Sequence, residues 1–314
     1  MILTLTLNPA IDRLVSVDKL VFEDRGYILS REETAGGRGV NASQVIHAFG
    51  GETLAVLTSG GPAGQRMEKS LSEMGFPFEA VRVRAETRVN LNVSDKQGLT
   101  IKLNEVGAPL EAHEVRAVKS RIEAKLGKGK SGTVSWLMIC GSIQPGVSPH
   151  FYCELIDMAR SRGVDTLLDT DGAALEHALE AKPSVVSPNQ QEAERLTGRA
   201  IITRSQALEA TQRIQAMGAQ SVILSLGSRG AFGIHEDSLW EAIPPRVEAL
   251  CPIGAGDALA AAFVWGRAKK KAFYDALRWG VAAGTAAASL PGISFPTFNQ
   301  TRAIYKQVEV KPAK

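Results

Sequence analysis

Short apolar segments alternate with helical segments along most of this 314-residue chain, and this alternation constrains its fold more than any other feature. Short buried strands between helices are typical of a parallel sheet that carries helices on both faces. We therefore predict an α/β fold. The predicted strands are 1–7, 53–58, 134–140, 165–169, 185–186 and 221–226, with a hairpin of 231–235 and 238–243. The predicted helices are 39–49, 63–74, 111–126, 149–162, 172–181, 190–196, 205–217, 258–268 and 274–289.

Two stretches, 12–34 and 78–103, break this rhythm, because they alternate like strands and contain no helical segment. Two β excursions from one α/β core can meet as one small sheet. Ligands of α/β folds bind at the carboxyl ends of the strands, so such a sheet would form a lid there. We assign 1–11, 35–77 and 104–314 to a nucleotide- and substrate-binding core, and the two excursions to the lid.

The bulk composition is that of an ordinary globular protein, with 44% hydrophobic and 22% charged residues. The net charge of +3 is too small and too dispersed to indicate a nucleic-acid partner. The three cysteines form no spaced pair, which favours a reducing compartment. The chain begins without a basic signal region, and no apolar run reaches the roughly 18 residues of a membrane span. We expect a cytoplasmic protein without a membrane partner.

The segment Gly254-Ala255-Gly256-Asp257 precedes a helix of small residues. Its glycines allow backbone N–H groups to turn toward an anion at the helix start, where the helix dipole favours negative charge. Asp257 beside such an anion site can accept a proton from a hydroxyl. Anion donors next to a base suit phosphoryl transfer to an alcohol. The same residues are also consistent with a tight turn that Asp257 caps.

A second glycine-rich loop, Gly36-Gly37-Arg38-Gly39, precedes the helix that contains Asn41. Glycines let the backbone approach a ligand closely, and the Asn41 amide can bind hydroxyls. The loop directly follows the first β excursion, which favours a ligand site over the alternative of a flexible loop with Asn41 as a cap.

Asn189 and Glu192 are three residues apart at a helix start and share one face. An amide and a carboxylate are hard oxygen ligands that suit Mg²⁺ held mainly through water. A capping box explains the same pair equally well. Ser225 to Gly230 form a glycine-rich turn after a strand, which is weak evidence for a nucleotide site. The five histidines show no zinc-ligand spacing.

Several segments, taken in order, resemble the ribokinase-like carbohydrate kinases, specifically the phosphofructokinase B group. That group includes 1-phosphofructokinase, the minor 6-phosphofructokinase and tagatose-6-phosphate kinase. The resemblance implies a ribokinase-like three-layer core with a central, mainly parallel sheet, and a small β-sheet lid that often forms a homodimer contact. It rests on 4–12, 36–41, 87–90, 141–146, 169–172, 188–192, 225–227, 254–257 and 280–287.

The resemblance also implies roles for single residues. Asp257 would be the base, and Gly254, Ala255 and Gly256 would form the anion hole. The implied substrate ligands are Asp12, Gly37, Asn41, Asn90 and Ser142, and Glu192 with Asn189 would organise Mg²⁺, largely through water. The implied ATP-binding residues are Asn189, Ser225, Gly227, Gly230, Gly254, Gly256 and Ala283. Whether a monovalent cation also binds stays open.

Three arginines favour a phosphorylated substrate. Arg88 lies where this branch of the family places a phosphate ligand, Arg25 aligns with a basic position, and Arg38 lies where lysine is common. Arginine offers a bidentate fork to phosphate, so three near one cleft would favour a dianion. Two positions depart from the family pattern. Ser187 replaces a lysine that would approach the ATP phosphates, and Pro252 replaces a common Thr or Ser.

The sequence therefore predicts an ATP- and Mg²⁺-dependent kinase that phosphorylates a hydroxymethyl group of a ketohexose phosphate to give a bisphosphate. Fructose 1-phosphate, fructose 6-phosphate and tagatose 6-phosphate are the candidate substrates. Two alternatives remain: a kinase of an unphosphorylated sugar or nucleoside, and a catalytically weak sugar-binding relative, for which Ser187 is the evidence.

Overall fold

The computed structural model describes residues 1–21, 23–127 and 133–313. Phe22, 128–132 and Lys314, which the predicted lid and core ranges include, lie outside the described residues. None of the described helices is both long and apolar enough to cross a membrane.

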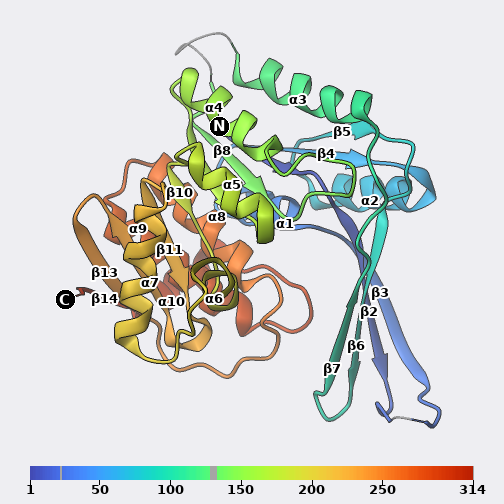
Figure 1. Ribbon diagram of the computed structural model, residues 1–314. Helices are drawn as coiled ribbons and strands as arrows, with labels where there is room; N and C mark the ends of the chain where they lie inside the picture. Colours follow the sequence, from blue (N-terminus) through green and yellow to red (C-terminus); the bar gives the residue numbers. More distant parts are fainter. Residues whose placement is uncertain (22, 128–132, 314) are drawn as a thin grey trace.

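Among the described residues, ten strands form one sheet in the order β14-β13-β12-β11-β10-β9-β8-β1-β4-β5 (Figure 1). From β11 to β5 neighbouring strands pair in parallel, and β12, β13 and β14 pair antiparallel. The strands are β1 (Ile2–Thr6), β4 (Thr53–Ser59), β5 (Phe78–Arg82), β8 (Trp136–Cys140), β9 (Asp165–Asp169), β10 (Val185–Val186), β11 (Ser221–Ser225), β12 (Ala231–His235), β13 (Ser238–Ile243) and β14 (Glu309–Pro312).

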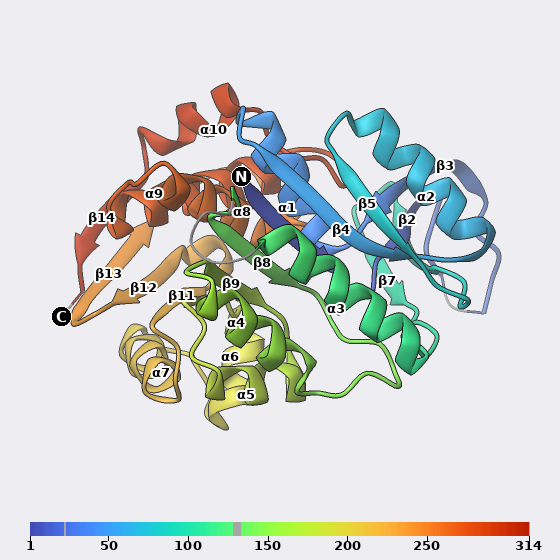
Figure 2. The same ribbon diagram turned by 90° about the horizontal axis from the view of Figure 1, so that it is seen from above.

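Helices cover both faces of this sheet, as seen from above in Figure 2. They are α1 (Arg38–Ala48), α2 (Gly61–Met74), α3 (Ala112–Leu126), α4 (Phe151–Ser161), α5 (Gly172–Glu180), α6 (Gln190–Thr197), α7 (Arg204–Ala216), α8 (Ala255–Ala268), α9 (Phe273–Ala288) and α10 (Phe298–Tyr305). Successive strand residues point to opposite faces. Leu137 and Leu168 therefore pack in a core with α3 to α7, and Met138 and Leu167 in a second core with α1, α8 and α9. The predicted three-layer α/β fold is confirmed.

Small residues allow α8 and α9 to pack closely. A Cβ atom on Gly284 would come within 2.9 Å of the Ala255 carbonyl oxygen, and one on Gly280 within 2.9 Å of the Leu259 carbonyl oxygen. Glycine at both positions removes this conflict, so α9 lies directly against the first turns of α8. The start of α8, which carries Asp257, is thereby fixed against the rest of the core.

The described residues also form a separate four-stranded sheet in the order β3-β2-β6-β7, and we keep the name lid for it (Figure 1). Its strands are β2 (Ala10–Val17), β3 (Ile28–Gly36), β6 (Arg88–Asp95) and β7 (Thr100–Asn104). The two predicted β excursions do meet, because β2 and β6 pair in parallel. The structure corrects one part of the lid range. Residues 78–82 are β5, which pairs with β4 at the edge of the large sheet because Val81 and Phe78 pack into the core.

Strand β1 lies between β4 and β8, so the chain leaves it in one direction for β4 and returns on the other side at β8. Such a switch point in a parallel sheet opens a crevice at the carboxyl ends of the strands. Thr6 and Asn8 lie at this end of β1, and Gly141 and Ser142 follow β8. The fold therefore places the predicted ligand loops at one edge, below the lid.

Candidate active site

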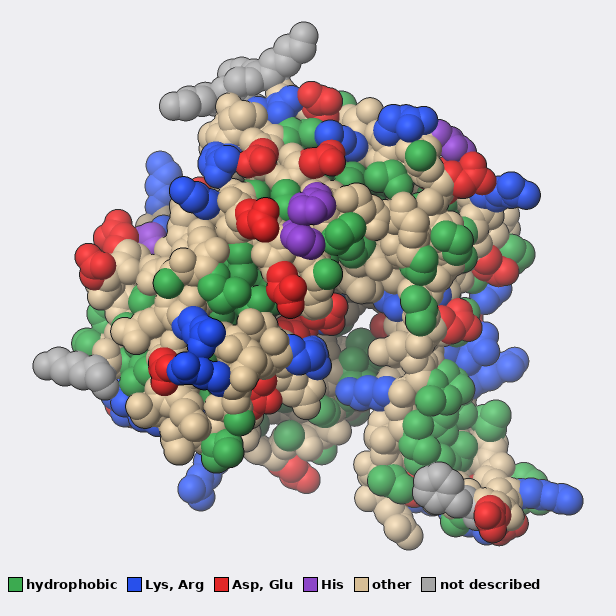
Figure 3. Space-filling view, viewed as in Figure 1, with side chains coloured by type: hydrophobic (Ala, Val, Ile, Leu, Met, Phe, Trp, Pro, Cys, Tyr) green, Lys and Arg blue, Asp and Glu red, His purple; other side chains and the backbone are tan. Residues whose placement is uncertain are grey.

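A cavity of about 480 Å³ lies at this edge, between the core and the lid. Figure 3 shows the hollow between the two parts. Most of the residues predicted from the sequence line it, although they come from distant parts of the chain. They are Asp12, Gly37, Arg38, Asn41, Arg88, Asn90, Ser142, Asn189, Glu192, Ser225, Gly254, Gly256 and Asp257.

The start of α8 forms one wall of this cleft. Gly254 is the N-cap of the helix and has a φ of 79°, a left-handed conformation that favours glycine. A Cβ atom on Gly256 would meet nothing within 4 Å, so the first turn is open toward the cleft. Backbone N–H groups at an open helix start attract anions. Ala255 is different, because it does not line the cleft and its N–H donates to the Pro252 carbonyl at 3.3 Å.

Asp257 lies in the first turn of α8 and is not the cap of the helix. Its Oδ2 atom accepts a hydrogen bond of 2.6 Å from the Asn41 side-chain amide. Burial raises the pKa of Asp257 to about 7, the Asp169 carboxylate adds to this shift, and the Asn41 hydrogen bond opposes it. A carboxylate that titrates near neutral pH is suited to accept a proton from an alcohol.

Three carboxylates surround the guanidinium of Arg38. Its Nη1 donates to Asp169 at 2.6 Å, and its Nη2 donates to Glu192 at 2.9 Å and to Asp171 at 3.5 Å. The charges of Asp169 first, and then of Glu192 and Asp257, raise the pKa of Arg38 despite its burial. Burial raises the pKa of Glu192, and Arg38 opposes that shift. Arg38 therefore faces a group of carboxylates at the carboxyl end of β9 and in the first turn of α6.

Asn189 and Glu192 form the capping box that was the alternative reading of this pair. Asn189 Oδ1 accepts from the Glu192 N–H at 3.0 Å, and Glu192 Oε2 accepts from the Asn189 N–H at 2.8 Å. Both residues also line the cleft, together with Asp169 and Asp171. Carboxylate and amide oxygens on one wall are a donor set that suits Mg²⁺, so the residues present fit the predicted metal.

The inner face of the lid is polar. Asp12, Asn90 and Asn104 stand in one row across β2, β6 and β7, and Asn92 and Lys102 pair in the next row. The Asp12 carboxylate accepts a hydrogen bond of 2.8 Å from the Asn90 side-chain amide, and burial raises the pKa of Asp12. The lid thus presents hydrogen-bonding groups and one ammonium group to the cleft.

Arg88 joins the lid to the core. Its Nη2 donates to the Asn8 carbonyl at 2.9 Å and its Nη1 to the Glu105 carbonyl at 2.7 Å. Burial lowers the pKa of Arg88, and the charges of Asp12 and Glu105 oppose this shift. Four buried polar atoms here have no partner in the described part of the chain: Thr6 Oγ1, Asn8 Oδ1, Arg88 Nε and Asn90 Oδ1. Buried polar groups are normally hydrogen-bonded, so this cluster indicates a polar ligand.

The structure does not bring four further predicted residues to the cleft. Arg25 is exposed in the loop between β2 and β3. Ala283 is fully buried in the core of α8 and α9, and its contact with ATP stays a prediction. Gly230 has a backbone reason to be glycine, because a Cβ atom would lie 2.0 Å from the Ala242 carbonyl oxygen. Gly227 begins a short turn after β11.

The cleft also contains residues to which the sequence analysis gave no role, including Asn8, Lys102, Asp169 and Asp171. Asn8 follows β1, Asp169 is the last residue of β9, and Asp171 follows it, so all three lie at carboxyl ends of strands, where ligand residues of parallel sheets gather. Lys102 and Asn104 alternate along β7 with Ile101 and Leu103, a period that separates the two faces of the lid. Polar residues at strand ends and the alternation along β7 are therefore sequence signals that could have predicted these cleft residues.

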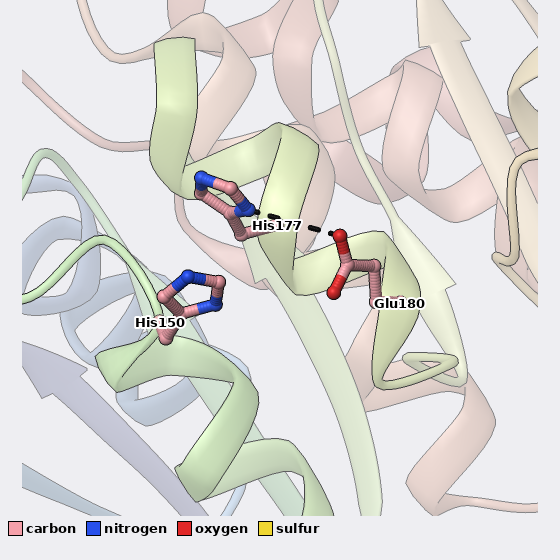
Figure 4. Close-up of side chains that lie close together, drawn as sticks. All are labelled: His150, His177 and Glu180. Atoms are coloured by element: carbon pink, nitrogen blue, oxygen red, sulfur yellow. Dashed lines mark ion pairs between the residues drawn. The ribbon is translucent and has the colours of Figure 1, made fainter.

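A second group of possible metal ligands, His150, His177 and Glu180, joins α4 to α5 outside the cleft (Figure 4). The two imidazole rings lie 4.1 Å apart, and His177 Nδ1 lies 3.7 Å from the Glu180 carboxylate. One possible ligand atom from each of the three side chains lies within 4.8 Å of the other two. We interpret this group as a contact between two helices.

Comparison with known proteins extends these observations. The model of the pfkB family carbohydrate kinases matches residues 6–299. The chain is 30% identical to the ATP-dependent 6-phosphofructokinase isozyme 2 of Escherichia coli (strain K12), over 97% of both chains. It is 28% identical to the tagatose-6-phosphate kinase of Staphylococcus epidermidis, over 99% of both chains.

A solved structure of phosphofructokinase-2 from Escherichia coli, in complex with substrates and products, matches with a TM-score of 0.90 and 29% identity over 98% of both chains. Other structures of that protein contain potassium or are a tetrameric inhibited form. The matched residues include the lid, the three carboxylates around Arg38 and the start of α8. The chain therefore belongs to the pfkB family of carbohydrate kinases.

Proposed function

We propose that this protein transfers the terminal phosphoryl group of ATP to a hydroxymethyl group of a ketohexose phosphate, giving a bisphosphate. Fructose 6-phosphate, tagatose 6-phosphate and fructose 1-phosphate are the candidate acceptors. The observation that carries the proposal is the environment of Asp257. Its carboxylate has a pKa near 7, is oriented by Asn41 and stands in the open first turn of α8.

Asp257 accepts the proton of the sugar hydroxyl while the hydroxyl oxygen attacks the terminal phosphorus of ATP, and ADP leaves. The helix start at Gly254 and Gly256 stabilises the charge that develops on the transferred group. Asp12, Asn41 and Asn90 bind sugar hydroxyls, and Ser142 stands beside them. Ser225, which lines the cleft, lies on the side proposed for the nucleotide. The lid limits access of water, which would otherwise compete as the acceptor.

Arg88 and Lys102 support a phosphorylated substrate. Arg88 is partly buried, and within the described part of the chain its guanidinium donates hydrogen bonds to main-chain carbonyls, so its charge is available to an anion. Lys102 faces the same cleft from β7. Two cations beside the polar row of the lid favour a dianionic sugar phosphate over a neutral sugar.

Glu192, Asn189 and the carboxylates of Asp169 and Asp171 would hold Mg²⁺, in part through water. The ion would neutralise charge on the ATP phosphates and help to position them. These residues also keep the ends of β9 and α6 together through Arg38. We leave a monovalent-cation site as a prediction, supported by the potassium complex of the Escherichia coli relative.

We further propose that the lid forms a homodimer contact. Its outer face carries apolar side chains, with Leu103 56% and Ile101 38% exposed, and Tyr27, Ile28 and Leu29 are exposed nearby. Figure 3 shows apolar side chains gathered along the lid strands. A second copy of the same face would cover this surface.

The test is ADP release measured in a coupled assay with ATP, Mg²⁺ and a panel of sugars. The panel contains the three ketohexose phosphates, ribose and fructose, with Asp257→Asn as the control variant. We expect turnover on a phosphorylated ketose that is lost in the control. Turnover on ribose or fructose alone would contradict the argument from Arg88 and Lys102. Sugar binding without any turnover would favour the catalytically weak relative.

A further inference from the structure

The cleft has an unusual distribution of charge around Arg38. Its guanidinium is held by Asp169 and Glu192, whose side chains are 9% and 2% exposed, and more weakly by Asp171. These three acids stand on the wall that carries Asn189 and Ser225, and not on the lid face that carries Arg88 and Lys102. Arg38 therefore points toward the proposed nucleotide side of the cleft.

The backbone at Ser187 runs directly beside this group. The Ser187 N–H donates to the Leu168 carbonyl at 3.0 Å, and Leu168 immediately precedes Asp169. Ser187 is 9% exposed and lines the same cleft, two residues before Asn189. A longer side chain at position 187 would thus emerge between Asp169 and the start of α6. Ser187 itself brings no charge to this place.

The proposed reaction needs positive charge here, because the bound ATP phosphates would face three carboxylates. Among the described residues, Arg38 is the basic side chain that forms ion pairs with this group. The oxygens that hold Arg38 belong to the donor set that suits Mg²⁺. An ion bound at these carboxylates would release the guanidinium, and its planar fork matches a phosphate as well as it matches a carboxylate.

We propose that Arg38, reaching over from α1, supplies the cationic group that residue 187 lacks, and that it acts on the ATP phosphates and not on the sugar phosphate. This inference rests on the proposed function. It changes the role expected of Arg38 from the sequence, where it was grouped with the ligands of the substrate phosphate. It also explains how a chain with Ser187 keeps a charged nucleotide site.

A purely structural role is the competing explanation, because Arg38 also ties α1 to β9 and α6. The two explanations differ in what a lysine at position 187 can restore. A clamp between α1 and α6 depends on the side chain at position 38. A missing charge can be supplied from the neighbouring position.

The experiment compares Arg38→Gln, Ser187→Lys and the double variant. Binding of a non-hydrolysable ATP analogue with Mg²⁺, and separately of fructose 6-phosphate or tagatose 6-phosphate, is measured by calorimetry. We expect Arg38→Gln to weaken binding of the analogue by about ten-fold or more and to change sugar-phosphate binding by less than about two-fold. The double variant should recover most of the lost nucleotide affinity and of the turnover.

The matched control is Arg121→Gln, which removes an arginine paired with Glu79 at 2.8 Å on the outer helix α3. It should change neither binding constant. Thermal unfolding of each variant is followed in parallel. If Arg38→Gln does not fold, Arg38→Lys replaces it: a nucleotide affinity within about three-fold of the wild type supports the proposal, and a loss of about ten-fold or more overturns it.

Two further outcomes would overturn the proposal. One is a loss of sugar-phosphate binding with unchanged nucleotide binding in Arg38→Gln. The other is a double variant that folds like the wild type and still binds nucleotide as weakly as Arg38→Gln. Nucleotide binding is measured without turnover. A wild-type protein that is inactive on every ketohexose phosphate would therefore contradict the proposed substrate, but the binding constants would still test the role of Arg38.

Discussion

The side-chain amide of Asn41, on α1, donates a 2.6 Å hydrogen bond to the carboxylate of Asp257, on α8. This bond stabilises the charged form of Asp257 and lowers its pKa against the effect of burial. The two residues come from opposite ends of the chain and belong to helices that pack on the same face of the sheet. The pair sets the pH at which the proposed base is available.

Asn41→Ala should therefore move the acid limb of the kcat profile to higher pH. Without the donor, the pKa of Asp257 rises above about 7, and a larger fraction of the base is protonated at neutral pH. We expect a shift of about 0.5–1 pH unit, measured at saturating sugar phosphate. An unchanged profile with only a raised KM would mean that Asn41 acts on the sugar alone.

Asp257→Asn should abolish turnover and stabilise the fold above neutral pH. The pKa of Asp257 is raised from 3.8 to about 7, so between these values the folded state binds more protons than the unfolded state. The free energy of unfolding of the wild type then falls as pH rises through this window. The variant lacks this dependence on pH. The free energy of unfolding of the variant minus that of the wild type should therefore increase by about 1–3 kcal/mol from pH 4 to pH 8. Denaturant unfolding at both pH values checks this, and a constant difference would contradict the assignment.

Arg88→Ala should raise the KM for the sugar phosphate by about ten-fold or more, because it removes a partly buried cation from the lid side of the cleft. The KM for ATP should change little. The matched control is Arg84→Ala, four residues earlier, whose side chain is 88% exposed. Steady-state kinetics with each substrate varied in turn separate the two effects, and equal losses for both substrates would argue against a sugar-phosphate ligand.

Leu103→Asp should dissociate the proposed dimer. It places a charge on the outer face of the lid, opposite the face that carries Asn104 and Lys102. Ile202→Asp is the control, since Ile202 is 74% exposed on the core, before α7. Analytical ultracentrifugation should show a monomer for the first variant and the wild-type mass for the second. A wild-type protein that sediments as a monomer would refute the proposed contact.

The sequence was sufficient to predict the α/β core and most of the cleft, because short apolar strands and glycine-rich turns are local signals. It misplaced 78–82, whose alternation reads equally well as a lid strand or an edge strand of the core. Only packing of Val81 against the large sheet decides between them. The sequence also could not predict the partners of Arg38, since Asp169 and Glu192 lie more than 130 positions away and meet it only in the folded chain.

The residues that line the cleft belong to the core and the lid, which are built on two separate sheets. The proposed chemistry of phosphoryl transfer belongs to the large sheet and to α8, whereas Asn90, Asn92, Lys102 and Asn104 belong to the small one. Side chains on the inner face of the small sheet can therefore be exchanged without altering the hydrophobic core around Asp257. An architecture of this kind lets a lineage of kinases acquire a new sugar by changing a few positions on two strands, while the phosphate donor and its machinery stay the same.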